Sequence, residues 1–123
     1  MKKLFLIPIC IGTLLLTSCE PKEPAILKVF VRSSTNSLVG NARVVVIGDQ
    51  QSNPPTMDFV DTVYTNSSGF VTINMDEYFN KYRNGDLNTT GQFDIIVEDG
   101  ISSGSGSARC RIHTTSVETV YLQ

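Results

Sequence analysis

Hydrophobic and polar residues alternate along several short stretches of the chain, which is the pattern of half-buried β-strands. The clearest stretch, residues 26–32, places Leu27, Val29 and Val31 on one face. Stretches rich in β-branched and aromatic residues recur between turn signals. The pattern predicts seven strands, at residues 26–32, 42–47, 58–65, 70–73, 92–98, 108–112 and 117–122.

Turn-forming residues separate the predicted strands. Gly69 ends the run Asn66-Ser67-Ser68-Gly69, where its freedom to take a positive φ predicts a hairpin. Residues 48–57 contain Gly, Asn and Pro54-Pro55 and predict a loop. Residues 99–107 are mostly Gly and Ser, and we expect a mobile hairpin loop there.

Only residues 74–82 have helical spacing. Asn74 can cap the first turn, and Glu77 follows at the spacing of a capping box. One face of this short helix carries Met75, Phe79 and Tyr82. Tyr78 lies on the other face and is expected to be the most exposed aromatic residue.

Short strands separated by turns, with a single helical insert, predict an all-β sandwich of two sheets over residues 25–123. Two strands are apolar on both alternations, because Val45 and Ile47 in one and Ile96 in the other face away from the predicted core. A sandwich of this size buries one face of each sheet. We therefore expect the helical insert to cover one outer patch and to leave another exposed.

The N-terminal segment has the composition of an export signal. Lys2 and Lys3 provide the positive start, and an apolar run over residues 4–16 follows. This run is too short to span a bilayer as a permanent helix. The sequence predicts that the segment directs export.

The run Leu16-Thr17-Ser18-Cys19 resembles the lipobox of bacterial lipoproteins. The resemblance implies that residues 1–18 are a removed signal peptide and that Cys19 carries the lipid, including palmitate-type acyl chains. Two or more chains hold a protein firmly on a membrane. The alternatives are an ordinary signal peptide with an incidental Cys, or an uncleaved anchor.

Residues 19–24 then form a short tether of about 15 Å, because Pro21 and Pro24 among charged residues favour an extended chain. By the same lipoprotein resemblance, Glu20 is not the Asp that marks retention at the inner membrane. This implies the outer membrane of the cell envelope, with the leaflet open.

Short segments of residues 25–123 resemble carboxypeptidase-regulatory-like and transthyretin-like domains. Val39-Gly40-Asn41-Ala42-Arg43-Val44 is similar to their G-x-x-x-G-A-x-V pattern, and residues 65–71 to their T-D-x-x-G-x-F hairpin. Residues 93–97 resemble the strand that follows. Asn41 replaces a Gly, Asn66 replaces an Asp, and the insert at residues 74–91 is long. The resemblance implies an Ig-like, seven-stranded sandwich that serves as a structural or binding module and carries no catalytic residues.

Charge and cysteine content limit the function further. Without Lys2 and Lys3 the ten basic residues fall to eight, against twelve acidic ones, which argues against nucleic acid as a partner. Cys10 lies in the signal segment, so Cys110 has no partner for a disulfide after Cys19 is lipidated. Cys110 is expected to be a buried small hydrophobe. The alternative, a thiolate activated by neighbouring arginines, is disfavoured because residues 109 and 111 point to the opposite face.

No catalytic group, cofactor site or metal site follows from the remaining candidates. His113, the one histidine, is expected in a solvated turn. Asp86 and Asn88, and likewise Asp58 and Asp61, suggest a calcium loop but lack the full set of oxygen ligands. An aromatic platform for sugar would come from Tyr64, Tyr78, Phe79, Tyr82 and Tyr121. Asp61-Thr62-Val63 resembles the short O-glycosylation acceptor of Bacteroidetes-type bacteria.

Two functional classes remain. The first is a membrane-anchored, non-enzymatic lipoprotein that acts as a structural or protein-interaction module with an envelope protein as partner. The alternative is a surface lipoprotein that binds carbohydrate or peptide for uptake or adhesion. An exposed aromatic cluster or a groove along one sheet favours the second class, and a smooth polar surface with one apolar edge favours the first.

Overall fold

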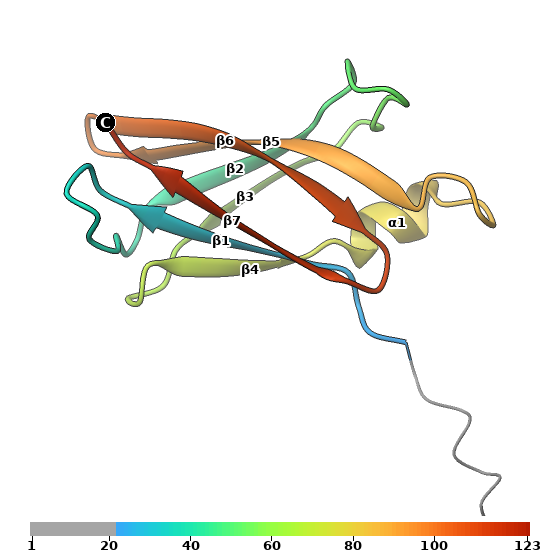
Figure 1. The fold of residues 1–123 in the computed structure, drawn as a ribbon, viewed down its shortest axis with the longest axis horizontal. Coiled ribbons are helices and arrows are strands. Elements are labelled where there is room, and N and C mark those ends of the chain that lie inside the picture. Colours follow the sequence, from blue (N-terminus) through green and yellow to red (C-terminus); the bar gives the residue numbers. More distant parts are fainter. Residues whose placement is uncertain (1–21) are drawn as a thin grey trace, which may run out of the picture.

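A computed structural model describes residues 22–123 as a two-layered β-structure with one helix at its end (Figure 1). In chain order the elements are β1 (Ile26–Arg32), β2 (Arg43–Gly48), β3 (Val60–Tyr64), β4 (Phe70–Asn74), α1 (Asp76–Tyr82), β5 (Thr90–Asp99), β6 (Ser102–Arg111) and β7 (Thr115–Tyr121).

The strands form two sheets, with orders β4-β1-β7 and β3-β2-β5-β6. The first and last strands, β1 and β7, pair in parallel, and all other pairs are antiparallel. The predicted fold class is confirmed: the chain is an all-β sandwich of seven strands with one short helix. Among residues 22–123, no helix is long and apolar enough to cross a bilayer.

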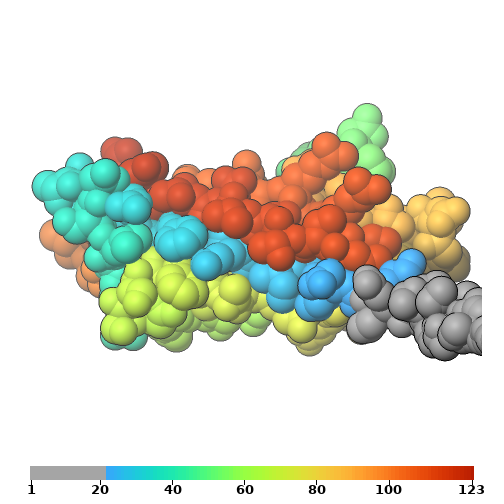
Figure 2. All heavy atoms as spheres, turned by 60° about the horizontal axis from the view of Figure 1, so that its bottom comes forward, coloured from blue at the N-terminus to red at the C-terminus, as the bar shows by residue number. Residues whose placement is uncertain are grey.

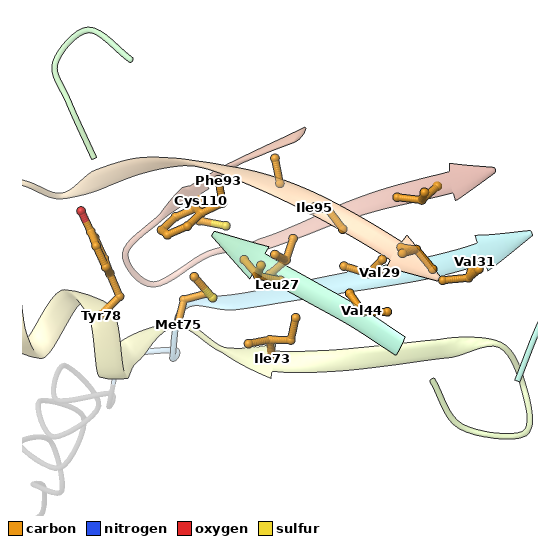
Figure 3. Packing of buried hydrophobic residues seen from close by; sticks show 14 of the residues in the cluster. Leu27, Val29, Val31, Val44, Ile73, Met75, Tyr78, Phe93, Ile95 and Cys110 are labelled. Carbon is orange, nitrogen blue, oxygen red and sulfur yellow. The ribbon is translucent and has the colours of Figure 1, made fainter. Parts of the chain in front are cut away.

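The core lies between the two sheets and comes from the alternation seen in the sequence (Figure 3). In β1 the inward residues are fully buried while their neighbours are half-buried. β2 and β5 contribute in the same way from the opposite sheet. The fully buried strand residues are Leu27, Val29, Val31, Val44, Val46, Phe93, Ile95 and Val97.

The predicted loop over residues 99–107 is wrong. Asp99 pairs with Ser102 across a two-residue turn, and β6 then runs antiparallel to the whole of β5. Gly104 faces inward at a point where a Cβ would overlap the carbonyl oxygen of Tyr121 in β7. The glycines therefore allow two backbones to approach closely, and they are part of a strand.

The helix begins later than predicted and has a different cap. Asn74 belongs to β4, and its Oδ1 accepts a hydrogen bond from the Asp76 N–H (2.8 Å). The N-cap is Met75, whose side chain makes no capping bond. The predicted capping box with Glu77 is therefore wrong. Asp76 instead uses Oδ1 to accept the N–H of Ala25 (3.0 Å), which joins the helix to the start of the domain.

Tyr78 is buried, contrary to the prediction that it is the most exposed aromatic residue. The helix lies across the open end of the sandwich, so two of its faces meet the core (Figure 1). The Tyr78 ring contacts those of Phe79 and Phe93 edge to face, at centroid distances of 5.1 and 5.2 Å. Its hydroxyl oxygen points out of this cluster and accepts the Met57 N–H (Figure 3).

The insert therefore fills the end of the core and covers neither outer sheet face. Met75 and Phe79 are buried, and Tyr82 packs against the core from its edge, as their shared face predicts. The expectation that the insert covers an outer patch is wrong. Among residues 22–123, no helix or strand covers the outer face of either sheet.

Candidate functional site

The predicted lipid site Cys19 and the signal segment lie outside the described residues, and so does the first half of the tether. The described chain joins the sandwich at its α1 end. The Glu23 carbonyl oxygen lies 2.8 Å from Nδ1 of His113, and the Ile26 N–H donates to the Thr114 oxygen. His113 is exposed in the turn between β6 and β7, as predicted, and this turn holds the tether.

The outer face of the four-stranded sheet carries a run of apolar side chains, which we call the apolar face. Its members are Val45, Ile47, Val60, Tyr64 and Ile96. They form neighbouring rows, because Val45 pairs with Ile96 and Ile47 pairs with Val60. Val60, Tyr64 and Ile96 are 63%, 56% and 40% exposed. The sequence prediction of outward apolar residues in these strands is confirmed.

Polar residues border the apolar face and also interrupt it, because Thr62 pairs with Val45 and Asp94 pairs with Ile47. Arg43 lies between Tyr64 and Glu98 in the sheet, and its Nη1 is 2.6 Å from the Glu98 carboxylate. β6 contributes a row of outward serines, at positions 103, 105 and 107. An apolar centre with a polar rim is the usual composition of a protein-binding surface.

The outer face of the three-stranded sheet, where β4, β1 and β7 lie side by side (Figure 2), differs because a lysine covers its aromatic residues. Phe30 and Phe70 are half-buried, with ring centroids 5.5 Å apart. Nζ of Lys28 lies over both rings, 5.2 and 4.4 Å from their centroids. This cation covers the faces of both rings, while Val117 and Tyr121 of β7 stay 54% and 51% exposed on the same side of the sheet. The alternation in β1 puts Lys28 and Phe30 on one face, but the pairing with Phe70 depends on the β1–β4 register, which the sequence does not show.

A polar hollow of about 520 Å³ lies at the α1 end. Its wall comes from the β2–β3 loop, the α1–β5 loop and the start of β5, with Arg109 of β6 at its side. The polar side chains that line it include those of Asn53, Asp86, Asn88, Gln92 and Arg109. Asp86 and Asn88 do lie together here, and Nδ2 of Asn88 donates to the Tyr82 carbonyl oxygen (2.9 Å).

The remaining candidates do not assemble into a reactive site. Cys110 is 1% exposed, and burial raises the pKa of its thiol from an ordinary 9 to about 11, so the thiolate interpretation is wrong. Within residues 22–123, His, Cys, Asp and Glu side chains form no group of three that could hold a metal ion.

The aromatic platform is wrong as well. Tyr78 and Phe79 are buried in the core. The two exposed members, Tyr64 and Tyr121, belong to β3 and β7 in different sheets. In the acceptor-like run Asp61-Thr62-Val63, Thr62 is exposed on the edge strand β3.

Comparisons with known proteins leave the family open, because no protein-family model matches the chain and no curated protein is significantly similar to it.

Proposed function

We propose that this protein is a membrane-anchored, non-enzymatic lipoprotein of the cell envelope that binds a protein partner through its four-stranded sheet. The observation that supports this most directly is the apolar face, which lies on a regular sheet, is bordered by polar groups and has no covering element among the described residues. Exposed apolar surface on a rigid sheet suits protein contact better than small-molecule catalysis.

The anchor in this proposal is Cys19, on the strength of the lipobox-like run before it. The tether meets the domain at the α1 end, so the opposite end, with the β5–β6 turn and the C-terminus, would point away from the membrane (Figure 1). Cys19→Ala should abolish acyl labelling and leave the precursor either uncleaved or soluble. A Cys19→Ala variant that labels and partitions like the parent would refute the anchor.

The interaction surface is tested with Val45→Lys combined with Ile96→Lys. Both side chains point out of the sheet, so we expect a loss of envelope partners in cross-linked pull-downs and little change in melting temperature. Thr119→Lys is the matched control, because Thr119 is exposed on the outer face of the other sheet. Unfolding of the double variant, or an unchanged pull-down, would contradict the proposal.

A carbohydrate ligand is the second candidate, and the polar hollow is the observation that favours it. Amides of Asn53 and Gln92 and the guanidinium of Arg109 could hydrogen-bond the hydroxyl groups of a sugar there. Arg109→Ala should then weaken binding on a glycan array while leaving the pull-down of protein partners unchanged. Binding to no glycan, or equal binding by the Arg109→Ala variant, would remove this candidate.

A further inference from the structure

β3 is an end strand of its sheet. The backbone N–H and C=O groups along its free edge have no partner strand among the described residues. The Gly48 N–H donates to Phe59 (2.8 Å), and the Thr65 N–H donates to Ala42 (3.0 Å). Because antiparallel strands alternate, the odd-numbered residues of β3 bond to β2. The N–H and C=O groups of Val60, Thr62 and Tyr64 therefore point away from the sheet, along its free edge.

The other end strands are covered more fully. β6 and β7 lie against each other, joined by the Gln123 N–H to the Ser103 oxygen and by Ser116 Oγ to the Arg109 oxygen (both 2.9 Å). In β4, the N–H and C=O of Phe70 already bond to Asn66 of its own turn. β3 is thus the longest unpaired edge among the described strands, and such edges accept added strands.

An acidic hollow of about 340 Å³ lies beside this edge, between the start of β3 and α1. Asp58, Asp61 and Glu77 line it, against one cation, Lys81. Nζ of Lys81 lies 5.2 Å from the Tyr82 ring centroid. Among residues 22–123 the only ion pair is Arg43–Glu98, so these three carboxylates have no basic partner. Their charge favours a basic side chain at this place.

We infer that β3 binds an extended segment of a partner protein as a fifth strand, and that a Lys or Arg of this segment enters the acidic hollow. The inference rests on the proposed function, because it assumes a protein partner. On the outer side, apolar residues of the added strand would extend the apolar face beyond Val60 and Tyr64. On the inner side, the residue beside Asp61 would be basic.

A second copy of this chain fits the same edge less well. Antiparallel pairing of two β3 strands about Thr62 would satisfy the backbone, but it would also bring two acidic hollows to one seam. Like charges across such a seam are unfavourable. A basic segment from another protein gains the backbone bonds without that repulsion.

The test is selection of a displayed library of random dodecapeptides on the intact protein, purified in detergent. We expect enrichment of alternating apolar sequences that contain one Lys or Arg. The best peptide, made synthetically, should bind Thr62→Pro at least about tenfold more weakly, because proline removes an outward N–H and blocks the added strand. Thr72→Pro is the matched control, because the Thr72 N–H also points away from its sheet, on the β4 edge.

The parent protein should bind the basic peptide more tightly than the same peptide with Gln in place of the Lys or Arg. The Asp61→Asn variant should show a smaller difference between the two peptides. No enrichment, enrichment without a basic residue, or equal loss in Thr62→Pro and Thr72→Pro would overturn the inference. Self-association that Thr62→Pro removes would show that a second copy occupies the edge, which also overturns it. Binding that Val45→Lys with Ile96→Lys abolishes but Thr62→Pro leaves intact would retain the proposed function and reject the edge.

Discussion

The two long sides of the sandwich differ in how the sheets meet. On one side β6 and β7 bring the sheets together, and the inward positions of β6 are filled by Gly104, Gly106, Ala108 and Cys110. On the other side β3 and β4 follow each other through the turn that ends in Gly69, and each is the end strand of its sheet. The inward side chains of β6 grow in size toward the α1 end, where aromatic residues fill the core.

The difference shows how residue size decides which strand edges stay available. Because Gly104 has no Cβ, the backbone of β7 can pack directly against β6 and cover it. β3 has larger inward residues, Asp61 and Val63, and it pairs with β2 on one side while no described strand pairs with its other edge. We call the β6–β7 side the closed side and the β3–β4 side the open side. The closed side stabilises the fold, while the open side leaves backbone groups free for binding.

Gly104→Val should produce the largest effect and break the closed side. Its Cβ would overlap the Tyr121 carbonyl oxygen, so β7 must move away from β6. We expect a loss of about 3 kcal/mol or more in the free energy of unfolding, measured by chemical denaturation. Ser105→Val, on the outward face of the same strand, is the control and should change stability little. A stable Gly104→Val protein would show that the two strands do not touch there.

Gly69→Val tests the turn that connects β3 to β4 on the open side. Gly69 has a φ of 81°, and a Cβ would lie 2.6 Å from the Cβ of Leu38. We expect a loss of about 1–3 kcal/mol without a change in the ligand specificity of the folded fraction. Gly85→Val isolates the backbone strain, because Gly85 has a φ of 62° and no atom within 4 Å of a Cβ. Equal losses in both variants would mean that contact with Leu38 is unimportant.

Substitution of Cys110 tests the packing of β6 near the α1 end of the closed side. Cys110→Ala should cost on the order of 1 kcal/mol at neutral pH, since a small buried side chain is shortened. Rapid reaction of the native thiol with a maleimide would contradict its burial. Reductant should leave the melting temperature of the parent unchanged, because this thiol is free.

The same residue gives a signed pH dependence. Burial raises the pKa of the thiol from 9 to about 11, so the folded state keeps a proton that the unfolded state loses. This contribution to stability is complete below pH 9 and is lost between pH 9 and 11. The Cys110→Ala variant should therefore lose less stability over this range in denaturation curves. Burial also raises the pKa of Tyr78, which both proteins retain, so their difference isolates the thiol.

Glu98→Gln should have the smallest effect and leaves both sides intact. The Arg43–Glu98 pair joins two central strands, and the side chains are 47% and 53% exposed. Exposed pairs contribute less than about 1 kcal/mol and are screened by salt. We expect a change within this range that disappears at high salt. A larger, salt-independent loss would show that the pair organises the rim of the apolar face.

Prediction from sequence was reliable where burial alternates with the strand period. In β1, β2 and β5, every second residue is apolar and points to the same side. The pattern alone therefore predicts that residues such as Leu27, Val44 and Phe93 lie in the core. Turn chemistry located Gly69, whose φ is positive as expected. Asn41 also has a positive φ (58°), at the position where the family resemblance expects Gly.

Prediction from sequence failed where the position of a residue depends on contact with a segment that is far away in the chain. The Ser and Gly residues of β6 carry no hydrophobic signal, and only the approach of β7 shows why they form a strand. Tyr78 faces away from the helix's first apolar stripe, and its burial depends on Phe93 and on the loop that carries Met57. The acidic hollow joins β3 to α1, which local spacing does not place together.

The amino-acid sequence by itself determined the β class, the inward faces of the central strands, the turn at Gly69 and the outward position of Val45 and Ile96. These depend on local backbone preference and on a period of two, which are properties of a few neighbouring residues. The tertiary structure alone decided that β6 and β7 close one side, that Tyr78 is core, and that β3 stays unpaired. Those outcomes depend on contacts between segments far apart in the chain, and no local pattern encodes which segments will meet.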